Sequence, residues 1–175
     1  QIQEDIAIWQ LNSEDDWLSA LHVCAPNGWA PADKIGKSFA DIHAQVPDMD
    51  RQRKQYLPML KGLIQKPAFS RFIWDLRTDS ILNHHPTKPR SAAFKRDNPH
   101  LYVRLERQVL YGLPACQAVL FLIRTYHYPV QSLSVDELQG IDHALAGMSP
   151  ELLAYKHLST DYEAIRLYLQ GLIQE

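Results

Sequence analysis

Charged residues interrupt two apolar stretches in the middle of the chain, and they are the first candidates for chemistry. Arg104, Glu106, Arg107 and Arg124 lie within residues 101–126, which read LYVRLERQVLYGLPACQAVLFLIRTY. Burying an unpaired guanidinium is costly, so each arginine needs a carboxylate, a bound anion or water in front of it. Two explanations are open: an internal Arg–Glu network that fixes the strand register, or a binding site.

A period of two assigns these charges to the faces of a strand. One face of the first stretch is predicted to be apolar and consists of Leu101, Val103, Leu105 and Val109. Arg107 falls on that apolar face, whereas Arg104, Glu106 and Gln108 occupy the other. The second stretch, 118–126, is apolar on both faces up to Arg124, which predicts a central strand with a cation near its end.

His43 is the second candidate for chemistry. It ends a predicted helix in which Ile35, Phe39 and Ile42 form one apolar stripe, and Pro47 follows shortly after. A lone histidine in such a place can be a satisfied structural residue. The alternative is a metal or haem ligand, which requires a neutral imidazole directed from a rigid element into an apolar slot.

Other chemistries find little support in the sequence. No Walker pattern, GxGxxG or GxSxG motif occurs, and no HExxH or spaced Cys/His set indicates zinc. Cys24 and Cys116 lie far apart within apolar runs, which favours reduced, buried thiols in a cytoplasmic protein. The net charge of -2 gives no electrostatic case for nucleic acid or an anionic membrane. No apolar stretch is long enough for a membrane span.

Length and composition predict one domain. A chain of 175 residues, 46% of them hydrophobic, can bury a single core, so we expect a single domain over residues 1–175. The chain opens on Gln1 within a strand-like pattern. This favours a fragment that lacks the N-terminal part of a longer protein.

The predicted elements must position these residues. Strands are expected at 4–11, 17–24 and 69–77 and in the two central stretches, and helices from Asp33 to Pro47, from near Asp48 with a kink at Pro58, and at 134–147, 150–158 and 160–174. Ser134 and Glu137 fit a capping box. Residues 78–99 form a long irregular loop. This order predicts an α+β fold, a PAS-like antiparallel sheet with helices packed on one face and additional C-terminal helices, and a ligand between the two layers.

Several segments together resemble a known family. They are GWAPADKIGKSFADIHAQVP at 28–47, the strand that contains Trp74, RLERQVLYGLP at 104–114 and LFLIRTY at 120–126. In this order they are similar to the haem-dependent oxidative N-demethylases. The resemblance implies a PAS-like fold, a b-type haem and the oxidative demethylation of a small secondary amine such as dimethylamine with O2. The products are formaldehyde and the shorter amine, and electrons come from a separate reductase subunit.

The resemblance also implies roles for individual residues. His43, in the DIHAQVP motif, is the expected axial ligand of the haem iron. The expected catalytic groups of the pocket are Glu106, Arg107 and Arg124. The remaining cofactor-binding residues are expected to be Lys34 and Arg104 at the propionates and Trp29 and Trp74 as apolar walls. The competing hypothesis is a non-catalytic PAS-like module that binds haem or a small ligand as a sensor.

Overall fold

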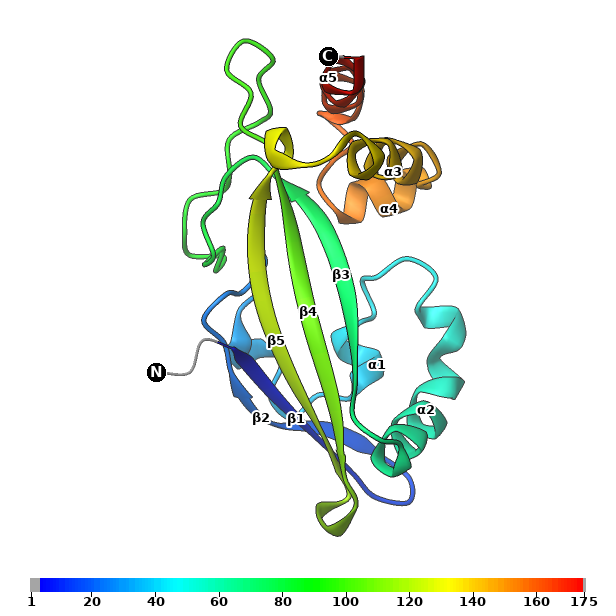
Figure 1. Ribbon diagram of the computed structural model, residues 1–175. Helices are drawn as coiled ribbons and strands as arrows, with labels where there is room; N and C mark the ends of the chain where they lie inside the picture. Colours follow the sequence, from blue (N-terminus) through cyan, green and yellow to red (C-terminus); the bar gives the residue numbers. More distant parts are fainter. Residues whose placement is uncertain (1–3, 175) are drawn as a thin grey trace. The chain divides into compact units, whose positions relative to one another are not determined.

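The computed structural model describes residues 4–174, without the side chain of residue 50, and contains a five-stranded sheet (Figure 1). The strands are β1 (Asp5–Leu11), β2 (Asp16–His22), β3 (Phe69–Arg77), β4 (Tyr102–Leu113) and β5 (Ala118–Pro129). Their order in the sheet is β2-β1-β5-β4-β3. β1 pairs antiparallel with both β2 and β5. The predicted central position of the second apolar stretch is therefore confirmed, since β5 has a neighbour on each side.

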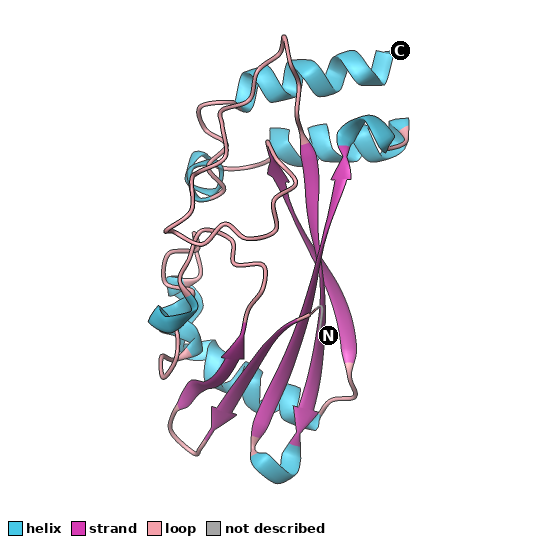
Figure 2. Ribbon diagram, turned by 90° about the vertical axis from the view of Figure 1, so that its left-hand side faces the viewer, coloured by secondary structure: helices cyan, strands magenta, loops and turns pink. Residues whose placement is uncertain are grey.

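Two groups of helices accompany the strands (Figure 2). They are α1 (Phe39–Ile42) and α2 (Arg53–Gln65) between β2 and β3, and α3 (Val135–Ala146), α4 (Pro150–Tyr155) and α5 (Tyr162–Gln174) after β5. The predicted α+β, PAS-like arrangement, with two strands, helices, three strands and additional C-terminal helices, is confirmed. No helix within residues 4–174 is long and apolar enough to cross a membrane.

The chain forms two compact units. Unit 1 comprises residues 4–73, 81–90 and 106–125, and unit 2 comprises residues 74–80, 91–105 and 126–174. Strands β3, β4 and β5 each contribute residues to both units. The single domain expected over 1–175 stays a prediction.

The core of unit 1 lies between α1, α2 and one face of the strands. Leu60 and Val119 are fully buried there, and Trp9, Phe39 and Phe121 belong to the same cluster. The expected apolar stripe of α2 is confirmed by the burial of Tyr56, Leu60, Leu63 and Ile64.

The helix predicted from Asp33 to Pro47 is shorter than expected. A 3₁₀ turn at Pro31–Asp33 is followed by turns, and α1 itself has four residues. Gly36 has a φ of +79°, and its N–H donates to the carbonyl of Leu18 in β2. A left-handed residue ends a helix, so the backbone turns toward β2 instead of continuing the stripe. Ile35 is consequently 48% exposed.

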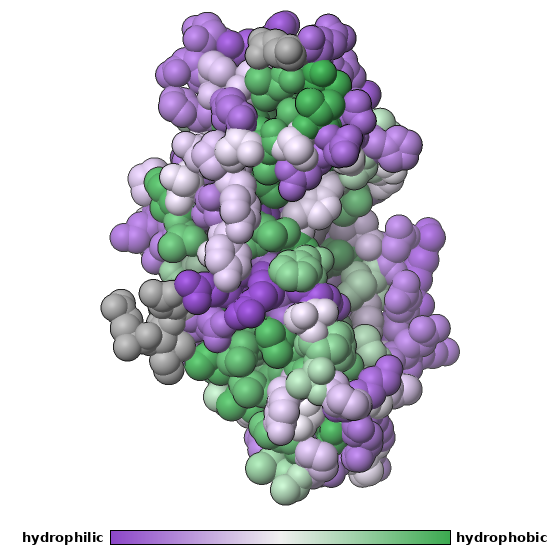
Figure 3. All heavy atoms as spheres, in the orientation of Figure 1, coloured by the Kyte–Doolittle hydropathy of each residue, from purple (hydrophilic) through white to green (hydrophobic). Residues whose placement is uncertain are grey.

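The prediction of which β4 face is buried in unit 1 was wrong. Gln108 and Leu110 are buried, whereas Val109 is half-buried and the Arg107 side chain is 39% exposed. The reason is that the helices of unit 1 pack on the face that carries Leu110. Apolar side chains also gather on the face of the unit 1 strands that Figure 3 turns toward the viewer.

Unit 2 has its own core around α3, α4 and α5. Leu145, Ile165 and Leu169 are nearly inaccessible there. The predicted capping box is present: the Ser134 hydroxyl accepts from the Glu137 N–H, and the Glu137 carboxylate accepts from the Ser134 N–H at 2.8 Å. Two reciprocal bonds therefore fix the start of α3.

Candidate functional site

The position of His43 is set by the contacts that hold α1 against β2. Ser38 caps the helix, because its hydroxyl accepts from the Asp41 N–H. The first helical N–H, that of Phe39, donates to the Asp16 carboxylate of β2 at 2.6 Å. Helix N-termini favour such a carboxylate. A short helix that could not persist alone is thus anchored at its start, and His43 is its C-cap as predicted.

The His43 imidazole has a defined orientation. Its Nδ1 lies 2.8 Å from the Phe39 carbonyl oxygen, and its ring stacks on the Phe39 ring with centroids 4.0 Å apart. The Trp9 indole also lies near the His43 ring, with ring centroids 6.4 Å apart. Because a carbonyl only accepts, Nδ1 carries the proton in the neutral ring, and Nε2 is left with its lone pair.

The surroundings of His43 favour its neutral form. Burial lowers the pKa of His43 below its usual value, and the positive charges of Lys34 and Arg71 lower it further against the opposing hydrogen bond to Phe39. Nε2 makes no hydrogen bond to any residue between 4 and 174. A neutral imidazole whose other nitrogen is held by a backbone carbonyl is the form in which histidine binds metals.

A buried donor near His43 also lacks a partner. Trp9 is 6% exposed, and its Nε1 is buried without a hydrogen bond within the part of the chain that the structure describes. Buried indole N–H groups usually have a partner. The surroundings of His43 therefore include an indole N–H that makes no hydrogen bond within the described residues.

Arg71 connects His43 to the charged part of β4. Its Nε donates to Gln108 Oε1 at 2.9 Å, and Gln108 Nε2 donates to Glu106 Oε2 at 2.9 Å. Its terminal nitrogens make no hydrogen bond with any described residue. Sequence reasoning missed Arg71. The available signal was its place in FSRFIWDLR, where it is a charge between aromatic residues of a predicted strand.

The other two predicted pocket residues are not brought together with His43. Arg107 Nη2 pairs with Glu4 Oε1 at 2.9 Å. An Arg–Glu ion pair of this kind is what the alternative explanation, an internal network that fixes the strand register, expects. Side chains alternate along a strand, so Arg107 lies on the face opposite Gln108. In β5, Arg124 likewise lies on the face opposite the buried Phe121. Their catalytic roles stay predictions.

The remaining predicted residues are distributed over both units. Lys34 and Trp29 belong to unit 1, and both are half-buried. Arg104 and Trp74 belong to unit 2. Arg104 is 2% exposed, and the Lys156 ammonium donates to the Trp74 carbonyl at 3.0 Å and lies over its ring. In unit 1, which also contains His43, the positive charge of Lys34 contributes to the lowered pKa of His43.

The thiols were predicted to be buried, and this was wrong. Cys24 and Cys116 are both free and exposed, because Cys24 lies in a bend after β2 and Cys116 in a 3₁₀ helix after β4 rather than inside a strand. Cys24 Sγ lies 3.4 Å from His22 Nε2. Across residues 4–174, no group of three or more His, Cys, Asp or Glu side chains could hold a metal ion.

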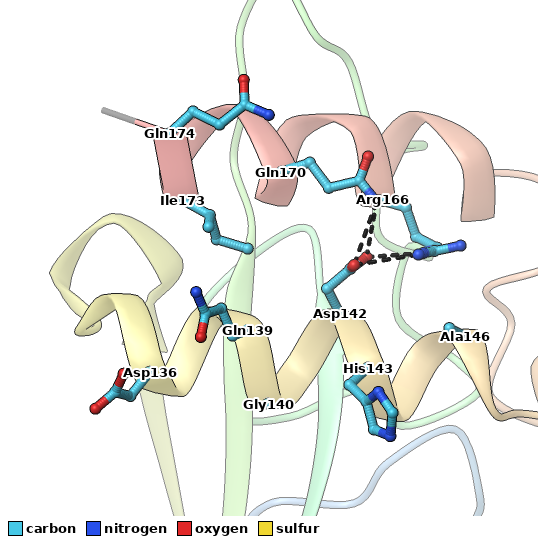
Figure 4. Close-up of a pocket in the computed structure, with 10 residues that line it drawn as sticks. All are labelled: Asp136, Gln139, Gly140, Asp142, His143, Ala146, Arg166, Gln170, Ile173 and Gln174. Atoms are coloured by element: carbon cyan, nitrogen blue, oxygen red, sulfur yellow. Dashed lines mark hydrogen bonds and ion pairs between the residues drawn. The ribbon is translucent and has the colours of Figure 1, made fainter.

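A groove in unit 2 involves none of the predicted residues. It runs between α3 and α5, has a volume of about 680 Å³ and is open to solvent (Figure 4). Asp142 accepts from Arg166 Nε and Nη2 at 2.7 and 3.1 Å and from Gln170 at 3.2 Å. Because these polar groups hydrogen-bond to one another, they hold α3 and α5 together, and we do not assign a ligand to the groove.

Comparison with known families decides the assignment. The model of the family described as "Haem-dependent oxidative N-demethylase, alpha subunit-like" matches residues 1–166. The chain belongs to this family. A search of solved structures also finds a Rhodobacter sphaeroides LOV protein, with 11% sequence identity, a TM-score of 0.35 and coverage of 98% of this chain and 85% of that one.

The residues around His43 fit the haem of the N-demethylase family. The oriented neutral imidazole is a suitable axial ligand, and the cations of Lys34 and Arg71 act on the same ring. Haem carries two propionates, so cations near His43 match its charge. The description of this N-demethylase family as alpha subunit-like implies partner subunits.

Proposed function

We propose that this chain binds a b-type haem through His43 Nε2 and acts as the haem subunit of an oxidative N-demethylase for a small secondary amine such as dimethylamine. The observation that carries the proposal is the hydrogen bond between His43 Nδ1 and the Phe39 carbonyl, which leaves Nε2 as the only basic nitrogen. Family membership supports haem dependence and oxidative demethylation at the level of the class.

The balance of this reaction defines the partners that it needs. One N-methyl carbon is oxidised to formaldehyde, and O2 accepts two electrons from the substrate and two from an external reductant. One oxygen atom leaves in formaldehyde and the other in water. Bound haem would supply the activation of O2. A separate reductase subunit in the cytoplasm would supply the electrons, and neither nucleic acid nor a membrane takes part.

Besides His43, the residues of the site would then divide into four roles. Lys34 and Arg71 would pair with the propionates, since the terminal nitrogens of Arg71 are unbonded within the described residues. Glu106 would hold the substrate ammonium. Arg107 and Arg124 are kept as catalytic candidates, Arg104 as a propionate partner, and Trp29 and Trp74 as apolar walls, on the family resemblance alone.

Absorption spectra of the full-length protein expressed with haem test this proposal. We expect a Soret band that is lost or shifted in the His43→Gln variant, in which the amide can still donate to the Phe39 carbonyl. The matched control is His85→Gln, which changes a half-buried histidine of the same unit and should leave the band unchanged. A protein without a Soret band would exclude the proposal, and an unchanged band in His43→Gln would exclude the ligand.

Turnover requires a second measurement. With dimethylamine, O2 and a reductant, the haem protein should release formaldehyde. If haem is bound but no small methylamine yields formaldehyde, the non-catalytic sensor function is favoured.

A further inference from the structure

We infer that Gln108 and Arg71 are positioning residues that orient the Glu106 carboxylate toward a small dialkylammonium cation. This inference rests on the proposed function, because it concerns how the substrate of that reaction is recognised. It concerns residues of β3 and β4 that lie in unit 1.

The orientation of the Gln108 amide is fixed by the chemistry of its two neighbours. A guanidinium can only donate, so the oxygen of the Gln108 amide must face Arg71. A carboxylate accepts, so the amide nitrogen must face Glu106. The two contacts determine the same amide rotamer, and the 7% exposure of Gln108 leaves little room for another.

Arg71 has a second effect through its charge. It acts on His43 on one side and interacts with Glu106 on the other. The Arg71 guanidinium therefore interacts electrostatically both with the Glu106 carboxylate and with His43, the candidate iron ligand. Because Glu106 and Gln108 are two residues apart on one strand, their side chains share a face.

Glu106 has the chemistry that the substrate needs. Simple alkylamines, like lysine, are protonated near neutral pH, so a dialkylamine arrives as a cation with two N–H donors. The carboxylate of Glu106 is an acceptor for such N–H groups, and Gln108 Nε2 donates to it at Oε2. A bond from Gln108 to one oxygen restricts rotation of the carboxylate and thereby sets the direction from which an ammonium can approach.

Steady-state kinetics of the haem-loaded protein with its reductant test the positioning role. In Gln108→Leu and Arg71→Gln, the KM for dimethylamine should rise about tenfold, while kcat changes less. A tenfold rise corresponds to the free energy of about one charge-assisted hydrogen bond. Gln10→Leu is the matched control, because Gln10 is a half-buried glutamine on β1 of the same unit. An unchanged KM in both test variants would overturn the inference while leaving the N-demethylase function intact.

A binding measurement on the chain itself is independent of turnover and of the folding of the variants. Dimethylammonium chloride is titrated into the isotopically labelled wild-type chain, with sodium chloride at equal ionic strength as the reference. The side-chain NH2 signals of Gln108 in the 1H–15N spectrum should shift, and the shift should be absent when sodium chloride is added. No selective shift would overturn the inference. A shift in a protein without a Soret band would uphold ammonium recognition and reject the haem function.

Discussion

The His43 ring stacks on the Phe39 ring at 4.0 Å and is hydrogen-bonded to the carbonyl of the same residue. One residue thus supplies both the apolar surface and the acceptor for the imidazole. Burial is the main reason why the pKa of His43 is lowered.

This lowered pKa predicts a pH dependence of stability. The unfolded chain takes up a proton on His43 near its usual pKa of about 6.5, whereas the folded chain resists protonation down to a lower pH. The free energy of unfolding should therefore fall as the pH decreases below about 6.5, and this part of the fall should be missing in His43→Gln. Urea unfolding of both proteins between pH 8 and 5 measures the difference. Parallel curves over this range would contradict the prediction.

The link between Asp16 and Phe39 predicts a further loss of stability. Asp16→Ala leaves the first N–H of α1 without its carboxylate, which should cost about 1 to 2 kcal/mol of unfolding free energy. Haem retention should decrease as well, because α1 carries His43. Denaturant unfolding and haem transfer to a competing apoprotein measure the two effects. Asp15→Ala, a change of the neighbouring exposed carboxylate, should affect neither.

Gly112 and Gly62 should respond in opposite directions to the same substitution. A Cβ at Gly112 would overlap the carbonyl of Ile64 and lie 2.7 Å from the carbonyl oxygen of Leu63, so Gly112→Ala should cost about 1 to 3 kcal/mol. A Cβ at Gly62, within α2, meets nothing within 4 Å, so Gly62→Ala should stabilise by about 0.5 to 1 kcal/mol. Thermal unfolding of the pair tests both signs. Equal effects would show that α2 does not lie this close to β4.

The ion pair between α3 and α5 predicts an acid-sensitive contribution in unit 2. Hydrogen bonds from Arg166 hold the pKa of Asp142 below its usual value. The pair should stabilise the fold at neutral pH, and this contribution should be lost as the pH falls below about 3.9. Asp142→Asn should lower the melting temperature at pH 7 and have a smaller effect at pH 3, where the contribution of the carboxylate has begun to decline. Gln139→Ala, which changes a groove residue whose side chain makes no hydrogen bond among the described residues, should be neutral at both.

Much of the fold could be predicted from the sequence where local chemistry decides it. The bounds of β3 and the capping box at Ser134 were predicted correctly, because they depend on neighbouring residues. His43 was correctly predicted at the end of a helix. Alternation along β4 showed which side chains share a face, but it could not show which face the helices would cover.

The candidate site illustrates the same limit. Its hydrogen bond between Arg71 and Gln108 joins residues 37 positions apart, and no local pattern relates them. The ion pair between Glu4 and Arg107 spans 103 positions. Ile35 was expected to be buried because the periodicity did not account for the positive φ of Gly36. Contacts between distant segments depend on the strand order, which periodicity leaves undetermined.

The edge position of β3 affects how the protein behaves at high concentration. β3 ends the order of the described strands, and Phe69, Phe72 and Ile73 on it are 40%, 61% and 42% exposed. An apolar strand edge of this kind can pair with another chain and seed aggregates, and a charge within it opposes such pairing. Arg71 is the only charge among residues 69–73, so it also protects solubility. Variants at this position should keep a polar side chain, because an apolar one would favour precipitation before any spectrum is recorded.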